Sequence, residues 1–240
     1  MQDYINCNKR PLIFLGSNIV MNQLKEICED YDIQIHGIID NDYHSSGKEF
    51  CGIPVIDTEK SFQDPDRLDF YRTNFNFFCA TNWIPEKNPV QERNREKRNN
   101  LIGLLDQYQL PVISLIDNKA NVSKYATIGR GVFIDAICNI EPDVVIDDYV
   151  WIGWASGIGH GTRIERNCVI QRQVWTGGFC HFESECFVGI GAKTLKTKAR
   201  FGKGTWIQEM VYIKRGTVPG EIVGLEGTNT RRIVVPPSID

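Results

Sequence analysis

Isoleucine recurs at every sixth position through the middle of this 240-residue chain. The run begins at Ile128, and its phase continues through Ile134, Ile140, Ile146, Ile152, Ile158, Ile164, Ile170, Thr176, Phe182 and Val188. A second column of small or β-branched residues lies two positions earlier: Ala126, Val132, Cys138, Val144, Val150, Ser156, Thr162, Cys168, Val174, Cys180, Cys186 and Ala192. A period of six fits neither an α-helix, with 3.6 residues per turn, nor a simple strand alternation. It fits a hexapeptide β-helix.

The repeat predicts a stack of triangular coils. Each hexapeptide would form one short strand and one turn, so three of them close a coil of 18 residues. We expect the isoleucine column to point into the prism and the small column to lie near its corners. The repeat covers roughly residues 121–218, about five coils. Its phase slips by one residue near Thr194 and resumes at Leu195, which we interpret as a bulge in a corner.

The corner column also accounts for four of the eight cysteines: Cys138, Cys168, Cys180 and Cys186. A buried thiol in such a column acts as a small apolar side chain. Cys168 and Cys186 are 18 residues apart, so we expect them on adjacent coils about 4.8 Å apart. We expect free thiols, because the sequence has no CxxC pair that would suggest a redox motif or a zinc site.

The N-terminal third has a different pattern, in which strands and helices alternate. Leu12 to Leu15 and Ile33 to Ile39 are strand-like, and Ile19 to Cys28 has helical spacing. Two more strand-like runs, "CGIPVID" and "FNFFCATN", precede an amphipathic helix in "VQERNREKRNNLIGLLDQY". This alternation predicts a parallel sheet with helices on its faces, and such sheets bind ligands at the carboxyl ends of their strands. The candidate binding residues there are Gly16, Ser17, Asn18, Asp40, Asn41, Thr81 and Asn82.

The turn after the first strand argues against a nicotinamide cofactor. It contains Gly16 alone, where a dinucleotide-binding fingerprint has three glycines. We interpret the charged run "QERNREKR" as a solvated helix face rather than a phosphate clamp.

Composition limits the partners. The net charge is −3 and no large Lys/Arg block is present, so we expect neither a nucleic-acid nor a membrane partner. The longest apolar runs are too short to span a bilayer, and the first residues do not have a signal-peptide pattern. We therefore expect a cytoplasmic protein.

Together these blocks resemble a known family. The order and spacing of "LIFLGSN", "GIIDND", "CGIPVID", "ISLIDNKANVSKYATIGRGVFI", "IEPDVVIDDYVWIGWASGIGHGT", "WTGGFCHFESECFVGIGAKTL" and "VPGEIVGLEG" are similar to sugar O-/N-acyltransferases of the sialic-acid and bacillosamine biosynthesis type. The resemblance implies an α/β Rossmann-like domain over residues 1–114, which would bind a nucleotide-linked sugar. It implies an all-β left-handed parallel β-helix with a C-terminal tail over residues 115–240.

The same resemblance implies an activity. These enzymes are homotrimers that transfer an acyl group, usually from acetyl-CoA, to an amino or hydroxyl group of a free or nucleotide-linked sugar. The acyl site lies in the cleft between neighbouring prisms, and no metal is needed.

His160 matches the general base of the family, which follows the strand isoleucine by two positions, here Ile158. An amine or hydroxyl must lose a proton as it attacks a thioester, and a neutral imidazole is suited to accept one near neutral pH. Gly178, one coil further, would leave space beside the imidazole. Gly189, Ile190 and Gly191 match the family's cofactor-lining block, and His181 is a further candidate for contact with acyl-CoA.

The sequence departs from the family at several sites. The acid that often follows the histidine is Gly161 here, although Glu141 and Asp143, about one coil earlier, could substitute. A second family histidine is Val169, and a later glycine aligns near Glu209.

These departures keep two alternatives open. One is a β-helical binding or scaffold protein that has lost catalysis, and in it His160 would only pack at a subunit face. The other is a metal hydrase of the same fold, which needs about three histidines as ligands, whereas only His160 and His181 lie in the repeat.

Overall fold

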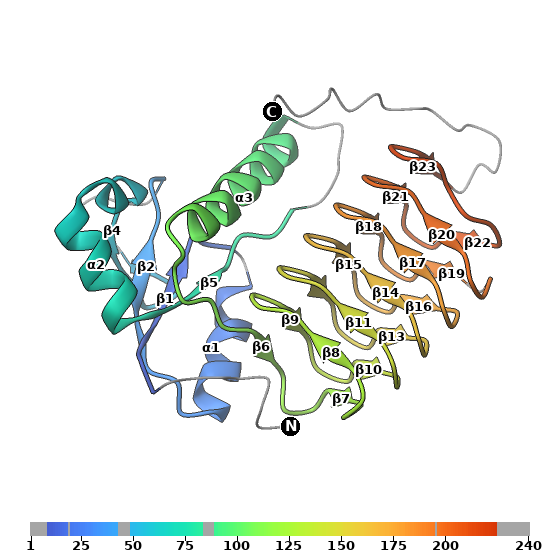
Figure 1. Cartoon of the computed structure of the whole chain (residues 1–240), viewed down its shortest axis with the longest axis horizontal. Coiled ribbons are helices and arrows are strands. Elements are labelled where there is room, and N and C mark those ends of the chain that lie inside the picture. Colours follow the sequence, from blue (N-terminus) through green and yellow to red (C-terminus); the bar gives the residue numbers. More distant parts are fainter. Residues whose placement is uncertain (1–8, 19, 43–48, 84–88, 195, 225–240) are drawn as a thin grey trace. The chain divides into compact units, whose positions relative to one another are not determined.

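The computed structural model describes residues 9–18, 20–42, 49–83, 89–194 and 196–224, with residues 89–93 described by backbone alone. Its contacts divide the chain into two compact units, Gln2–Leu115 and Ile116–Asp240. Figure 1 shows an α/β arrangement in the first unit and stacked short strands in the second.

The second unit is a parallel β-helix with three sheets. The first sheet contains β7 (Asn121–Val122), β10 (Asn139–Ile140), β13 (Gly157–Ile158), β16 (Trp175–Thr176), β19 (Lys193–Thr194) and β22 (Tyr212–Ile213). The second contains β8 (Thr127–Ile128), β11 (Val145–Ile146), β14 (Arg163–Ile164), β17 (His181–Phe182) and β20 (Arg200–Phe201). The third contains β6 (Leu115–Ile116), β9 (Phe133–Ile134), β12 (Trp151–Ile152), β15 (Val169–Ile170), β18 (Phe187–Val188), β21 (Trp206–Ile207) and β23 (Ile222–Val223).

The chain passes through the three sheets in turn, and each passage makes one coil. We call the turn from the first sheet to the second the first corner, the next the second corner, and the turn back to the first sheet the third corner. Strands one coil apart pair in parallel, and before the phase slip their spacing is 18 residues, as in the pairing of Ile146 with Ile164. Across the slip the spacing is 19, as in the pairing of His181 with Arg200. This arrangement agrees with the left-handed β-helix that the resemblance implies.

Both predicted columns have the expected burial. From Ile134 to Val188 every member of the isoleucine column is at most 9% exposed, and every member of the small column from Ala126 to Ala192 is at most 6% exposed. The cysteines of this column are buried and free, and Cys168 contacts Cys186 on the next coil. The phase slip lies in the first corner between β19 and β20. The inward residue before it is Thr194, paired with Thr176 and Ile213, and Leu195 lies outside the described residues.

A third column has no counterpart in the sequence prediction. The residue three positions after each inward residue has a left-handed backbone, with φ between +55° and +69° from Gly131 to Gly191. Its members include Ile137, Tyr149 and Phe179 as well as glycine, asparagine and aspartate. A left-handed backbone costs a residue with a Cβ roughly 1–2 kcal/mol. Closure of the coil therefore fixes this conformation whichever residue is present.

The first unit contains a five-stranded sheet in the order β3-β4-β2-β1-β5. Its strands are β1 (Leu12–Leu15), β2 (Ile35–Ile39), β3 (Glu49–Phe50), β4 (Ile53–Asp57) and β5 (Asn76–Cys79). All are parallel except β3, which forms an antiparallel hairpin with β4. Its helices are α1 (Met21–Asp30), the 3₁₀-helix η1 (Glu59–Gln63), α2 (Pro65–Asn74) and α3 (Pro89–Gln107).

The strands and the first and last helices confirm the predicted alternation, but helix α2 was not predicted. It begins after Asp64, whose carboxylate accepts hydrogen bonds from the N–H groups of Asp66 and Arg67. Among its residues only Tyr71 is buried. The helix therefore has no apolar stripe that a periodicity analysis could detect.

Candidate functional site

His160 lies on the first corner, between β13 and β14. Its side chain is 56% exposed, so the imidazole faces solvent at the edge of the prism. Gly161, with φ +63°, supplies the left-handed residue of this corner.

Glu141, one coil earlier on the same corner, holds this histidine. Its Oε2 atom accepts a hydrogen bond from the main-chain N–H of His160 at 2.7 Å and lies 3.0 Å from Nδ1 of the imidazole. Of the two acids considered from the sequence, the structure thus brings Glu141 to the histidine. Asp143 instead occupies the left-handed position of its corner, with φ +61°. A neutral imidazole that donates from Nδ1 to Glu141 carries its lone pair on Nε2.

The main-chain contact of Glu141 is repeated elsewhere in the β-helix. Glu165 accepts from the N–H of Ser184 at 3.0 Å, and Glu183 accepts from the N–H of Lys203 at 2.7 Å. In each case an acid at the start of a corner binds a main-chain donor one coil further. We call this contact the corner clamp. It fixes the position of Glu141 independently of the imidazole.

Gly178 and Phe179, one coil beyond His160, enclose the imidazole on the other side. A Cβ atom on Gly178 would lie 2.7 Å from Nε2 of His160, so the absent side chain leaves the space that the imidazole occupies. The ring of Phe179 stands edge-to-face against the imidazole, with centroids 4.9 Å apart and planes at 89°.

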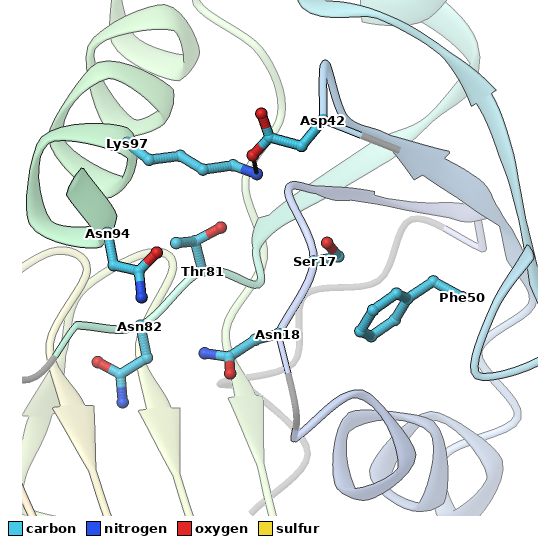
Figure 2. Close-up of a pocket in the computed structure, with 8 residues that line it drawn as sticks. All are labelled: Ser17, Asn18, Asp42, Phe50, Thr81, Asn82, Asn94 and Lys97. Carbon is cyan, nitrogen blue, oxygen red and sulfur yellow. Dashed lines mark hydrogen bonds and ion pairs between the residues drawn. The ribbon is translucent and has the colours of Figure 1, made fainter. Parts of the chain in front are cut away.

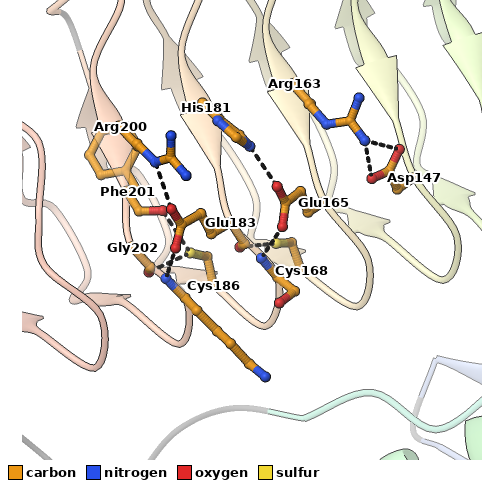
Figure 3. A network of polar contacts seen from close by, with 12 residues as sticks. Asp147, Arg163, Glu165, Cys168, His181, Glu183, Cys186, Arg200, Phe201 and Gly202 are labelled. Carbon is orange, nitrogen blue, oxygen red and sulfur yellow. Dashed lines mark hydrogen bonds and ion pairs between the residues drawn. The ribbon is translucent and has the colours of Figure 1, made fainter.

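His181 lies on the outer face of the second sheet rather than on the first corner. Its Nε2 atom is 2.7 Å from Oε1 of Glu165. Figure 3 shows this contact in a row of polar pairs, between the ion pairs Asp147–Arg163 and Glu183–Arg200. The structure therefore places the His181 ring against the Glu165 carboxylate, and its predicted contact with acyl-CoA stays a prediction.

Gly189, Ile190 and Gly191 lie on the third corner, between β18 and β19. Ile190 is 44% exposed. A Cβ atom on Gly189 would lie 2.6 Å from the main-chain nitrogen of Glu209, and Gly191 has φ +69°. The local structure therefore accounts for both glycines without a cofactor. One chain therefore carries His160 and Ile190 on two different edges of its prism. Val169, at the position of the second family histidine, is fully buried.

A cavity of about 200 Å³ lies at the carboxyl ends of the strands in the first unit. Figure 2 shows the side chains that line it: Ser17, Asn18, Asp42, Phe50, Thr81, Asn82, Asn94 and Lys97. The sequence predicted four of these, Ser17, Asn18, Thr81 and Asn82. The Oγ1 atom of Thr81 is buried without a hydrogen-bond partner among the described residues. A Cβ atom on Gly16 would lie 2.2 Å from this Oγ1, so Gly16 makes room for Thr81.

Asp40 contributes a fully buried carboxylate beside this cavity. It accepts a hydrogen bond from Ser17 Oγ at 2.7 Å and from Lys97 Nζ at 3.0 and 3.1 Å. Lys97 also donates to Asp42 at 2.7 Å. Burial disfavours the charge on Lys97, but these hydrogen bonds from its ammonium outweigh burial and raise its pKa. Asn41 does not line the cavity, because its side chain bonds Glu59.

The interpretation of "QERNREKR" as a solvated face is wrong for its last two residues. Lys97 binds the two carboxylates beside the cavity, and Arg98 is 1% exposed and donates to the main-chain oxygen of Thr81. The cavity residues that sequence reasoning missed are Asp42, Phe50, Asn94 and Lys97.

Among the described residues, no group of three or more histidine, cysteine, aspartate or glutamate side chains could hold a metal ion. Within the same part of the chain, no helix is long and apolar enough to cross a membrane.

Several solved structures have this fold over nearly the whole chain. The acetyltransferase domain of PglB from Neisseria gonorrhoeae FA1090 has a TM-score of 0.73 and 18% identity, covering 92% of this chain and 100% of that one. A mutant perosamine N-acetyltransferase from Caulobacter crescentus, solved with CoA and GDP-perosamine, has a TM-score of 0.71 and 17% identity, with 92% and 96% covered. WeeI from Acinetobacter baumannii AYE has a TM-score of 0.55 and 16% identity, with 93% and 99% covered.

No protein-family model and no curated protein matches the sequence. At these identities the structural likeness shows a shared fold.

Proposed function

We propose that this chain transfers an acyl group, with acetyl-CoA as the donor, to an amino or hydroxyl group of a sugar. The observation that carries the proposal is the pair of His160 and Glu141 on an exposed corner of a β-helix. Solved sugar N-acetyltransferases have the same fold, and one of them was solved with CoA and a nucleotide-linked amino sugar.

His160 would act as the general base. Its Nε2 takes the proton from the amine or hydroxyl as that group attacks the thioester carbon, which contributes about 10²–10⁴-fold to the rate. Glu141 keeps the Nδ1–H tautomer and stabilises the imidazolium that forms. Collapse of the tetrahedral intermediate expels the CoA thiolate, which takes the proton back from the imidazolium. No enzyme nucleophile is needed in this direct attack.

The acceptor would be nucleotide-linked and held by a Rossmann-like N-terminal domain. The support is the cavity at the carboxyl ends of parallel strands, where such sheets bind ligands. Its hydroxyl and amide side chains can hydrogen-bond sugar hydroxyls or a base edge, and Phe50 offers an aromatic face. Acyl-CoA and nucleotide-linked sugars are cytoplasmic metabolites, so the proposal places the reaction in the cytoplasm.

The active form would be a homotrimer of left-handed prisms. His160 and Ile190 lie on different edges of one prism, so a site that uses both needs a second copy. In the proposed trimer, the first corner of one copy faces the third corner of its neighbour, and acyl-CoA binds between them.

A second candidate is a non-catalytic binding protein with this fold. Gly161 and the buried Val169 favour it, since both replace polar residues that the family uses.

A thiol-release assay separates the two candidates. Purified protein, acetyl-CoA and a panel of nucleotide-linked amino sugars would be compared with His160→Ala, and His36→Ala would serve as the control. Acceptor-dependent CoA release that is lost only in His160→Ala supports the transferase. If no CoA is released and millimolar CoA does not change the melting temperature, the result supports the binding protein.

A further inference from the structure

Phe179 combines two unfavourable features in one residue. Its backbone is left-handed, with φ +56°, and its side chain is 52% exposed. An aromatic residue in this conformation is strained, and a half-exposed ring gains little free energy from burial to offset the strain. Closure of the coil imposes this backbone on every corner, so the contacts of the ring are what distinguish Phe179 from the other left-handed residues.

The ring of Phe179 packs against the corner that carries the histidine. It covers Gly161, where a Cβ atom would lie 2.5 Å from Cδ1 and from Cε1 of the ring. It stands edge-to-face against the imidazole of His160 at 4.9 Å. The main chain fixes this arrangement, because the N–H of Phe179 donates to the carbonyl oxygen of His160 at 2.7 Å.

The imidazole would be poorly oriented without this ring. Glu141 holds it at Nδ1 alone, and a single hydrogen bond leaves the plane of the ring free to turn. The glycines at positions 161 and 178 offer no side chain that could block this rotation. The only side chain in ring contact with His160 among the described residues is that of Phe179.

We propose that Phe179 is a positioning residue, which fixes the plane of the His160 imidazole so that Nε2 points to the acceptor. This inference rests on the proposed function. It also explains why position 161 is glycine in this chain. An acid at 161 would place a Cβ 2.5 Å from the phenyl ring, so the ring of Phe179 would have to leave its present position. The orientation that such an acid could give comes here from Glu141 and Phe179 together.

The test compares two left-handed corner residues. Phe179→Gly removes the ring, and Ile137→Gly is the matched control, with φ +59° and 59% exposure on another corner. Glycine relieves backbone strain at both positions, so both variants should keep or raise the melting temperature. Only Phe179→Gly should lower kcat/KM, by about tenfold or more, because small misplacements of a catalytic group are costly. Phe179→Tyr, which keeps the ring, should retain activity.

A second readout does not depend on activity. Carbon-13 relaxation of the His160 imidazole C–H groups should show a rigid ring in the unaltered protein and in Ile137→Gly. In Phe179→Gly the order parameters should fall, because the hydrogen bond at Nδ1 leaves the plane of the ring free to turn. A Phe179→Gly protein with kcat/KM within twofold of the unaltered protein and an equally rigid ring overturns the inference. If no protein in the series transfers an acyl group, the proposed function fails, and the relaxation comparison still decides the role of Phe179. Phe179→Asn, which tolerates the left-handed region, replaces Phe179→Gly if the glycine variant does not fold.

Discussion

Oε2 of Glu141 binds both the main-chain N–H and Nδ1 of His160, at 2.7 and 3.0 Å. The first contact belongs to the corner clamp that also occurs at Glu165 and Glu183. The contact with Nδ1 occurs because the residue whose main-chain N–H is bound in the clamp is a histidine. A structural contact of the β-helix therefore places a carboxylate beside the imidazole of His160.

We expect Glu141→Gln to lower kcat/KM by roughly 10–100-fold with little change in KM for acetyl-CoA. The amide of glutamine can accept from the main-chain N–H, so the clamp is kept. The same oxygen can still accept from Nδ1, but it carries no charge to stabilise the imidazolium. Steady-state kinetics measures the effect, and Glu183→Gln, with the same clamp on another corner, is the control. Equal losses in the two variants would assign Glu141 to stability alone.

The period of six predicted the inward and corner columns because burial in a stacked coil repeats with the coil. It did not predict the left-handed column, because closure of the coil imposes that conformation on residues as different as Gly161, Phe179 and Ile137. The contact of Phe179 with His160 follows from that conformation and was missed with it. Likewise the pattern indicated Glu141 and Asp143 equally, and only the direction of each side chain distinguishes them.

Only half of the residues that line the N-terminal cavity were predicted, for a similar reason. Strand ends are visible in sequence, so Ser17, Thr81 and Asn82 could be named. Lys97 could not, because it lies in a charged helical run that resembles a solvated face. Its partner Asp40 lies 57 positions earlier, and only the packing of α3 near the end of β2 joins them.

Lys97→Met should destabilise the protein by about 3 kcal/mol, since it leaves the fully buried Asp40 carboxylate without its cation. Lys97→Met combined with Asp40→Asn should recover most of this loss, because the uncompensated charge is then absent. Urea unfolding of the single and double variants measures the coupling, and Lys60→Met, at an exposed lysine on η1, is the control. Additive losses in the double variant would contradict the role of Lys97 as the counter-ion of Asp40.

Ile164→Asp should prevent folding. Ile164 is fully buried and stacked between Ile146 and Phe182 on the second sheet, so an aspartate there would place an unpaired charge inside the prism. Thr127→Asp, on the exposed outer face of the same sheet, should fold normally. Circular dichroism and gel filtration check both variants. A folded Ile164→Asp protein would show that the inward column is wrong.

The buried corner thiols predict a loss of stability in alkali. Burial raises the pKa of Cys138 to about 12 and that of Cys168 well above its usual range. In the unfolded chain these thiols ionise near pH 9, whereas the folded protein keeps their protons. The folded state therefore binds more protons above pH 9, and its stability falls as pH rises, by about 1.4 kcal/mol per pH unit for each such thiol.

Cys138→Ala should remove the contribution of one thiol to the fall of stability with pH. Unfolding free energies of the two proteins between pH 9 and 11 should differ in slope by about 1.4 kcal/mol per pH unit, whatever their difference at neutral pH. The thiol reagent DTNB gives a second check, because it should react with the exposed Cys51 in the folded protein and reach Cys138 only after unfolding. If the unfolding free energies of the two proteins fall equally with pH, or if Cys138 is labelled rapidly in the folded protein, this corner of the prism is open to water.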